Sequence, residues 1–387
     1  MNEPLKRVEY SEGKGFISSI DEIIEDLRNG RMVVLVDAED RENEGDLVIP
    51  AQMATPDAIN FMARFGRGLI CLALTEERAD ALRLEAMART NRTRMGTAFT
   101  VSIEAKDGIS TGISAADRSH TIRTAIDASK DHRDLVSPGH IFPLVARDGG
   151  VLVRAGHTEA SVDLARMAGL TPAGVICEIM NDDGTMARMP DLVAFAQRHG
   201  LKIGTIEDMV AHRLRHDSIV KRVGETDVTS AFGAGFRMVA YETTVDAVEH
   251  LALVKGDLSQ PGPVLVRVHA VDPAADLLGI GAAVGQPAQL ARAMEIVGKE
   301  GRGVIVLIRD LRPKAVSQWI EAKSTGTTPV AQIRPGRERR TVEVGIGSQI
   351  LRDLGVQEMV LLTNSPAHVY VGLEGYGLKI VGQRKIG

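Results

Sequence analysis

An acidic loop near the N-terminus carries the densest group of residues that could do chemistry. Its carboxylates come in the order Asp37, Glu39, Asp40, Glu42, Glu44 and Asp46, with Arg41 among them. Carboxylates this close repel each other unless a cation or a shared proton relieves them, and hard cations such as Mg²⁺ prefer oxygen ligands. A charge run is also typical of a solvated turn. This one, however, follows directly on the apolar run 32–36, and Gly45 permits a sharp bend, so the loop is a candidate metal and substrate site.

A second candidate segment runs from Arg154 through Ala155, Gly156 and His157 to Thr158. It joins a predicted strand over 149–154 to a helix that Thr158 is expected to cap. The free N–H groups of a helix N-terminus, with an arginine and a hydroxyl beside them, form an anion site that suits a phosphate. A capped turn without a ligand is the alternative, and His157 is accordingly either a metal ligand or a surface histidine.

Two single residues complete the candidate set. His140 follows a Pro-Gly turn that holds it on a rigid loop, although such a histidine can also be purely structural. Glu178 lies inside the apolar run 175–180, where a carboxylate needs a partner or a raised pKa. With the acidic loop, these groups supply acids, a histidine base, metal ligands and a phosphate cradle. That set suits proton abstraction next to a carbonyl whose oxygen a metal polarises.

The elements that must position these groups follow from the hydrophobic pattern. Apolar residues at helical spacing, with Ser19 and Glu22 as a capping box, predict a helix over 18–30. Thr55 followed by Pro56 predicts the start of another helix. Further predictions for this half are strands over 32–36, 47–49, 68–74, 98–103 and 175–180, a loop over 107–135, and helices over 158–167, 190–199 and 205–215. Short connections between several strands favour a mixed α+β fold over a doubly wound parallel sheet.

The weakly patterned stretch 216–235 places a domain boundary near residue 217, which gives domains over 1–217 and 218–387. In the second domain the expected elements are strands over 264–269, 303–308 and 359–363 and helices over 287–297 and 346–354. Their alternation predicts an α/β-type domain.

Composition excludes several classes of protein. The net charge of −5 and the 3% of aromatic residues do not favour a nucleic-acid partner. Two cysteines a hundred residues apart, Cys71 and Cys177, form no disulfide framework or thiolate zinc site, which fits a reducing cytoplasm. The N-terminus lacks the apolar region of a signal peptide, and no apolar run is long enough to span a membrane.

The first domain resembles 3,4-dihydroxy-2-butanone 4-phosphate synthase of riboflavin biosynthesis. The matching stretches include DAEDRENEGDLVIPA, GISTGISAADRSHTIRTA, SPGHIFPL, GGVLVRAGHTEASVDLARMAGL and GVICEIMNDDGTMARMPDL. The resemblance implies conversion of D-ribulose 5-phosphate to L-3,4-dihydroxybutan-2-one 4-phosphate and formate, by enolisation, dehydration and skeletal rearrangement. It also implies Mg²⁺ as the usual metal and a homodimer with its sites near the dimer interface.

The same resemblance assigns roles to individual residues. Glu42 and His157 correspond to the metal ligands, and since a histidine ligand is softer than Mg²⁺ prefers, Mn²⁺ could substitute. His140 and Glu178 correspond to the essential acid/base pair. The implied substrate contacts are Arg41, Glu42, Asp46, Arg154, Ala155, Gly156, His157, Thr158 and Glu178. Neither Glu44 nor Cys71 receives a role.

The second domain resembles GTP cyclohydrolase II in patches such as VLVRVHAVD and LEGYGLKIVG, but it departs from that family at its zinc site. The three cysteine positions of the family read Asp272, Ala283 and Gly285, and no cysteine follows Cys177. Without thiolates a zinc ion is not held and its water is not activated. The catalytic Asp and Arg positions read Arg340 and Val342, and another family segment reads RDLRP over 309–313. We therefore expect a degenerate domain that binds no zinc and does not hydrolyse GTP.

Three alternatives remain open at this stage. One is a bifunctional enzyme with an unusual second site. In another, the second domain is a regulatory nucleotide-binding or dimer-support module, in which Thr363 could contact a nucleotide. The third, a non-catalytic phosphate binder, does not explain the complete set of His140, Glu178 and loop acids.

Overall fold

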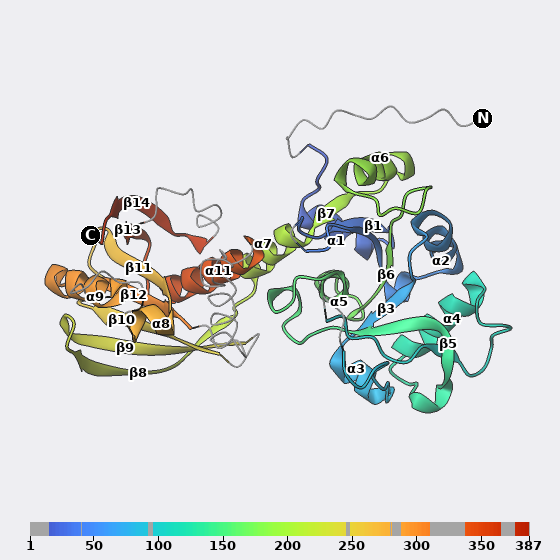
Figure 1. Ribbon diagram of the computed structural model, residues 1–387, viewed down its shortest axis with the longest axis horizontal. Coiled ribbons are helices and arrows are strands. Elements are labelled where there is room, and N and C mark those ends of the chain that lie inside the picture. The colour runs from blue at the N-terminus through green and yellow to red at the C-terminus, as the bar shows by residue number, and fades with distance from the viewer. Residues whose placement is uncertain are drawn as a thin grey trace. The chain divides into compact units, whose positions relative to one another are not determined.

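The computed structural model describes residues 15–39, 41–91, 96–244, 248–278, 280, 288–309, 337–364 and 376–386. The chain divides into two compact units, Met1–His212 and Arg213–Gly387 (Figure 1). Within the described residues no helix is both long and apolar enough to cross a membrane.

The first unit is built on a seven-stranded sheet with the order β4-β5-β3-β6-β2-β1-β7. Its strands are β1 (Val33–Val36), β2 (Gly45–Pro50), β3 (Cys71–Leu74), β4 (Ile103–Ala105), β5 (Leu135–Val145), β6 (Ala173–Glu178) and β7 (Ile203–Thr205). The pairs β1–β7 and β3–β5 are parallel and the other neighbouring pairs are antiparallel. The sheet is thus mixed, which confirms the predicted α+β fold.

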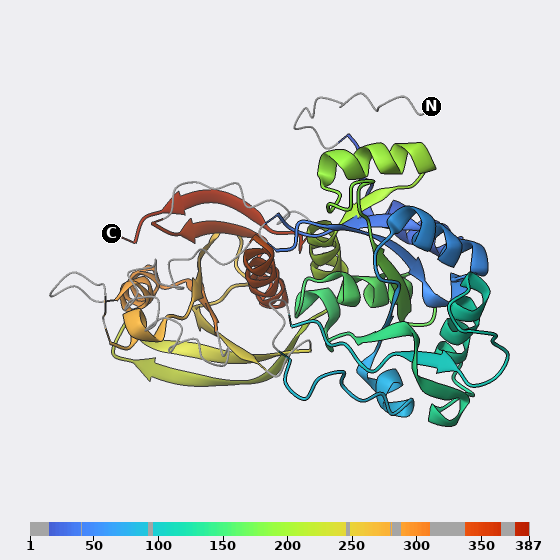
Figure 2. The same cartoon turned by 45° about the vertical axis from the view of Figure 1, so that its right-hand side comes forward.

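Helices cover both faces of this sheet (Figure 2). Helices α1 (Ile20–Arg28) and α5 (His157–Met167) pack on one face, and α2 (Pro56–Phe61), α4 (Ala115–Ile126) and α6 (Met189–His199) belong to the other. The remaining helices of the unit are α3 (Glu76–Ala81), α7 (Ile206–His216), which crosses into the second unit, and the short turns η1 (Ala51–Met53), η2 (Met62–Gly66), η3 (His132–Asp134) and η4 (Gly150–Leu152).

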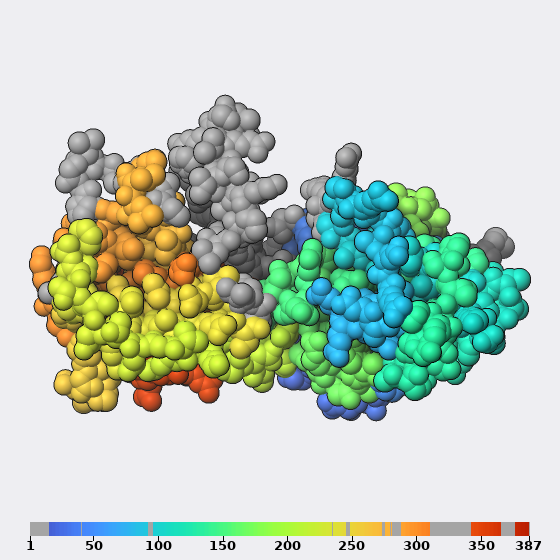
Figure 3. Space-filling view, turned by 90° about the horizontal axis from the view of Figure 1, so that it is seen from below, coloured from blue at the N-terminus to red at the C-terminus, as the bar shows by residue number. Residues whose placement is uncertain are grey.

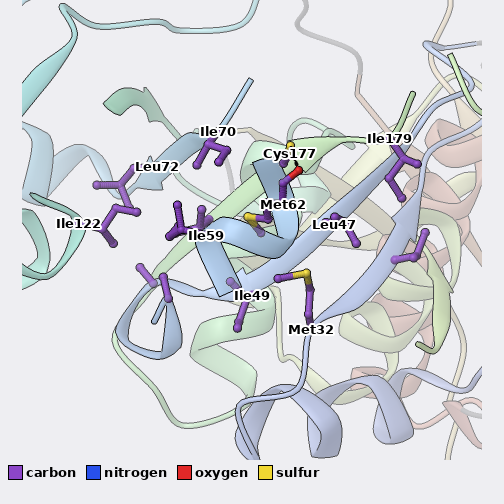
Figure 4. Close-up of a cluster of buried hydrophobic side chains, with 14 of the residues drawn as sticks. Met32, Leu47, Ile49, Ile59, Met62, Ile70, Leu72, Ile122, Cys177 and Ile179 are labelled. Atoms are coloured by element: carbon purple, nitrogen blue, oxygen red, sulfur yellow. Dashed lines mark hydrogen bonds between the residues drawn. The ribbon is translucent and has the colours of Figure 1, made fainter. Parts of the chain in front are cut away.

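The core against α2, α4 and α6 is apolar and closed. Alternate strand residues such as Leu47, Ile49 and Leu72 point into it because side chains alternate between the faces of a strand. They meet Ile59 and Met62 from α2 and the turn after it, as Figure 4 shows. The opposite alternation sends Asp46 of β2 toward the α5 face.

Local signals placed several helices correctly. The predicted capping box of α1 is present, since the Ser19 hydroxyl accepts from the Glu22 N–H and the Glu22 carboxylate accepts from the Ser19 N–H. Thr55 caps α2 by accepting from the Ala58 N–H, and Pro56 occupies the first helical position. Both predictions are confirmed.

Four local predictions are wrong. The segment 107–135 is not a loop throughout, because helix α4 begins after its cap residue Ser114. Ser119 and Thr121 are buried in α4, so the polar composition of the segment concealed a packed helix. The segment 149–154 is not a strand: positive φ angles at Gly149 and Gly150 bend it into η4. Residue Gly156, not Thr158, caps α5. Of the strand expected over 98–103, only Ile103 lies in a strand, β4, while Phe99 and Thr100 form isolated bridges.

The second unit contains another mixed seven-stranded sheet, with the order β14-β13-β11-β12-β10-β9-β8. Its strands are β8 (Val220–Ser230), β9 (Ala234–Thr243), β10 (Glu249–Lys255), β11 (Val264–Ala270), β12 (Gly303–Ile308), β13 (Glu358–Leu362) and β14 (Lys379–Arg384). Helices α8 (Pro273–Asp276), α9 (Gln289–Glu300) and α11 (Arg337–Asp353) accompany them. The weakly patterned stretch 216–235 forms β8 and the start of β9, and β8 lacks a hydrophobic alternation because it is an edge strand that is mostly exposed (Figure 3, yellow-green).

Candidate active site

The acidic loop lies at one end of the first sheet. It connects β1 to β2, whose antiparallel register pairs Val36 with Gly45, and β2 in turn pairs Asp46 with Glu178 at the end of β6. Residues directly opposite in an antiparallel pair project to the same face. Two carboxylates from distant parts of the sequence therefore meet on the α5 face of the sheet. Asp40 of the loop lies outside the described residues.

Asp37 organises the loop. Its side chain is buried, and its Oδ2 accepts from the Arg41 guanidinium at 2.7 Å and from the Glu42 N–H at 3.1 Å. Its Oδ1 accepts from the Glu44 N–H at 2.8 Å. Arg41 also pairs with Glu42 at 2.6 Å. The sequence interpretation gave Asp37 no role, although its position at the end of a buried strand was a usable signal.

His157 reaches the loop from the first turn of α5. Its Nε2 lies 3.1 Å from the Leu35 carbonyl oxygen, which can only accept, so the proton resides on Nε2 and the Nδ1 lone pair is free. Nδ1 faces Asp46 Oδ1 at 3.8 Å. Burial lowers the pKa of His157 below its usual value. A neutral imidazole oriented by a backbone carbonyl is the form that binds metals.

Oxygen and nitrogen donors converge at this point. Ligand atoms of Asp37, Glu42 and His157 all lie within 4.8 Å of one another. The structure thus brings together Glu42 and His157, the two residues singled out as metal ligands, and adds Asp37. Two carboxylates and a neutral imidazole fit a divalent cation that accepts oxygen and nitrogen ligands.

Asp46 is an electrostatically costly neighbour of these groups. It is 3% exposed, and its Oδ1 has no hydrogen-bond partner in the described part of the chain. Burial raises its pKa well above the usual value, and the charges of Glu178, Glu44, Glu42 and Asp37 add to the effect. An orphaned carboxylate oxygen inside a ring of acids is the pattern that a bound cation or a substrate hydroxyl would relieve.

Glu178 is held by the backbone of a neighbouring loop. Its Oε2 accepts from the Leu69 N–H at 2.8 Å. A Cβ at position 68 would lie 2.4 Å from the same oxygen, so only glycine allows this approach. The half-buried carboxylate is therefore held by this backbone N–H, on the residue that the strand register pairs with Asp46.

Two arginines converge on the N-terminus of α5. A Cβ at position 156 would lie 2.5 Å from Arg154 Nη1 and 2.9 Å from Arg41 Nη2, so Gly156 permits their close approach. Glu159, 1% exposed, pairs with Arg154 at 2.5 Å. Two guanidinium groups beside a helix N-terminus form a strong anion site. Ala155 lies in this turn, and Thr158 is buried inside the helix.

His140 lies at the same end of the sheet but not in contact with these groups. His140 lies on β5, two residues before Phe142. Phe142 pairs with Cys71 of β3, and Cys71 pairs with Ile176 of β6. One strand thus separates His140 from Glu178. The contact of His140 is Glu104 of β4, which faces its Nδ1.

Glu44 and Cys71, for which the sequence predicts no role, both have defined positions in the first unit. Glu44 lies beside the cluster, where burial and the charge of Glu42 raise its pKa while Arg188 opposes the shift. Arg188 donates to the carbonyl oxygens of Glu42 and Asn43, which ties α6 to the loop. Cys71 is buried in β3 below the site.

The second unit has a smaller polar cluster on β11. His269 pairs with Asp276 at 2.8 Å, and Asp276 also accepts from the Asp272 N–H at 2.9 Å. Asp272 is thus placed, whereas Ala283, Gly285 and residues 310–313 lie outside the described residues. The side chain of Arg340 is likewise not described.

A mixed sheet that ends in clustered carboxylates, a buried neutral imidazole and two arginines defines an enzyme suited to metal-assisted chemistry on a small anion. Residues 21–212 match the family described as 3,4-dihydroxy-2-butanone 4-phosphate synthase, and residues 221–385 match GTP cyclohydrolase II. The chain belongs to the 3,4-dihydroxy-2-butanone 4-phosphate synthase family, whose members are enzymes of riboflavin biosynthesis.

Relatives and solved structures agree with this assignment. A 3,4-dihydroxy-2-butanone 4-phosphate synthase of Pseudomonas syringae pv. tomato is 50% identical over 94% of this chain and 97% of its own. The riboflavin biosynthesis protein RibBA of Aquifex aeolicus is 49% identical over 94% of this chain and 91% of its own. The crystal structure of RibBX, a two-domain synthase from A. baumannii, covers 95% of this chain and 99% of its own with a TM-score of 0.81 and 41% identity. A synthase structure in complex with two magnesium ions covers 52% of this chain and 99% of its own, with a TM-score of 0.51 and 43% identity.

Proposed function

We propose that the first unit converts D-ribulose 5-phosphate to L-3,4-dihydroxybutan-2-one 4-phosphate and formate. The observation that carries the proposal is the convergence of Asp37, Glu42 and His157 beside the opposed pair Asp46 and Glu178. Family membership supports the reaction, and the anion site at Gly156 supports a phosphorylated substrate.

In this proposal Glu42 and His157 bind Mg²⁺, or Mn²⁺ in its place, with Asp37 beside them. When bound, the metal acts as a Lewis acid that polarises a carbonyl oxygen. Arg41, Arg154 and the turn through Ala155, Gly156, His157 and Thr158 bind the phosphate end of the substrate. Glu42, Asp46 and Glu178 contact its hydroxyl groups.

Glu178 and His140 serve as the acid/base pair. Glu178 has its carboxylate fixed by the Leu69 N–H, which keeps one oxygen available for a substrate proton. His140 is the second proton carrier. Since one strand separates the two residues within a chain, we propose that the active form is a homodimer in which the site lies near the dimer interface.

For the second unit we propose a module that supports the first and binds no zinc. The chain has no cysteine after Cys177, and Asp272 occupies one of the expected thiolate positions. An aspartate at that position does not supply the thiolate that the three-cysteine zinc site of that family requires. The domain boundary near residue 217, a cytoplasmic location, and the absence of nucleic-acid and membrane partners belong to the same proposal.

The experiment that tests the proposal measures formate from two substrates in parallel. The purified full chain is incubated with Mg²⁺ and either ribulose 5-phosphate or GTP. Formate from ribulose 5-phosphate alone is the expected result, and Glu178→Gln should abolish it while the protein stays folded. No formate from ribulose 5-phosphate would reject the function, and formate from GTP would reject the role of the second unit.

A further inference from the structure

Glu104 lies next to the proposed proton carrier His140 and has no role so far. It belongs to β4, its side chain is 15% exposed, and its Oε1 meets His140 Nδ1. The histidine side chain is 44% exposed, so its remaining edge is open to a ligand. An ionised carboxylate can accept a hydrogen bond but cannot donate one, so its contact with Nδ1 holds the proton of the neutral ring on that nitrogen.

The surrounding backbone confines Glu104 to this contact. A Cβ at position 139 would lie 2.5 Å from Glu104 Cγ and 2.1 Å from the Ile103 carbonyl carbon. Gly139 therefore lets the strand segment that carries His140 approach β4 closely. Two hydrogen bonds fasten the segments, one from the Gly139 N–H to Ser102 Oγ at 3.1 Å and one from Ser137 Oγ to the Ser102 carbonyl at 2.8 Å.

A second loop, which contains Gly112, also lies close to the Glu104 carboxylate. A Cβ at position 112 would lie 1.7 Å from Glu104 Oε1, and Gly112 has a φ of +86°. Asp117 of α4 fixes this loop by accepting from the Gly112 N–H at 3.0 Å and from the Ser110 hydroxyl at 2.7 Å. A side chain at either position would collide with Glu104, so both glycines leave room for the carboxylate where it meets His140.

We propose that Glu104 is a positioning residue that orients the His140 imidazole and fixes its tautomer. With the proton on Nδ1, Nε2 carries the lone pair that takes a proton from the substrate carbon next to the carbonyl. The electron pair of the broken C–H bond stays with the substrate as an enolate, and Glu104 stabilises the imidazolium that forms. The proton returns from Nε2 in a later step. This inference rests on the proposed function, because it assigns to His140 the work of a base.

Kinetics of a double-mutant cycle test the proposal. Removing the group that orients a metal-bound histidine costs about 10–100-fold in affinity or activity. We expect Glu104→Gln to lower kcat by a factor of similar size, with a smaller change in KM. In the His140→Ala background the same substitution should have no further effect, because Glu104 acts through His140. Glu104→Asp should recover part of kcat. The matched control is Glu85→Gln, at an exposed glutamate in the preceding segment, which should keep full activity.

The outcomes separate this proposal from the function itself. If the wild-type chain forms no formate, the proposed function fails before any variant is compared. If the wild type is active and His140→Ala keeps a low but measurable rate, multiplicative losses in the double variant overturn the positioning role alone. Full activity of Glu104→Gln in the otherwise unchanged chain overturns that role whether or not His140→Ala has a measurable rate. A readout that needs no Glu104 variant is ¹⁵N NMR of histidine-labelled wild type, with the His140 signal assigned from its loss in His140→Ala. The neutral ring should carry its proton on Nδ1, and a ring protonated on Nε2 would overturn the proposal.

Discussion

Replacing Asp46 by asparagine should separate the stability of the first unit from its activity. Asp46→Asn keeps the shape of the side chain, removes its charge, and provides an N–H that can donate to the carboxylate of Glu178. The wild-type side chain is 3% exposed with an unpartnered Oδ1 in the described structure. A buried polar group left without a partner costs about 1–3 kcal/mol. We therefore expect the metal-free variant to gain about that much free energy of unfolding.

The gain should depend on pH in one direction. The native pKa of Asp46 is raised above the unfolded value of about 3.9. Below the unfolded pKa both states hold the proton, and the native carboxyl carries no electrostatic penalty. As the pH rises through the native pKa the wild type loses stability, whereas the asparagine variant does not titrate at this position. The stability gap should therefore open above about pH 4 and persist at pH 8.

Scanning calorimetry of the full chain in EDTA measures this gap. For a domain of this size 1–3 kcal/mol corresponds to a rise of about 2–12 °C in the unfolding midpoint of the first unit. Added Mg²⁺ should narrow the gap, because the cation offsets the negative charge around Asp46 and should therefore bind the native wild type more tightly than the uncharged variant. Formate production by the variant should fall below detection. Asp148→Asn, at an exposed aspartate, is the control. A lower midpoint for Asp46→Asn in EDTA at pH 8, or an equal gap at pH 4 and pH 8, would refute the reasoning.

Three further predictions concern other buried groups. Glu159→Gln should destabilise the first unit by about 3–5 kcal/mol in urea titrations, because it removes the charge of a buried carboxylate that pairs with Arg154 at 2.5 Å; a loss below about 1 kcal/mol would show that the pair is replaceable. Neither cysteine should react with a thiol reagent in the native protein at pH 8, because both are buried and the pKa of Cys177 is raised to about 12, chiefly by burial and next by the charge of Glu178. Two thiols should react in denaturant, and rapid labelling of the native protein would contradict the burial. Tyr241→Phe should destabilise the second unit by about 1.5–3 kcal/mol, since it removes the hydroxyl that donates to Asp353 at 2.6 Å; an unchanged unfolding midpoint would contradict this.

The elements with local signals were predictable from the sequence. Helix α1 has its capping box and helical apolar spacing within a dozen residues, and β1 is a short apolar run. Such patterns depend on neighbours along the chain. The helix α4 was missed because its buried face contains Ser119 and Thr121, whose hydroxyl groups bond to distant backbone atoms. The edge strand β8 was missed because solvent faces most of its side chains, so no alternation was required.

The candidate active site also has features that the sequence predicts and features that depend on the tertiary structure. By itself the sequence determined which groups are present: the acids of the loop, His157 before a helix, and Glu178 in an apolar strand. Tertiary structure alone decided which of them meet, because the strand register opposes Asp46 to Glu178 and α5 delivers His157 to Asp37. Likewise, the contact between Glu104 and His140 depends on two glycines at positions 112 and 139 that allow backbones to approach. Residue types are local properties of the sequence. The distances at which their side chains can react or bind together are set by how strands pair and how closely the chain packs.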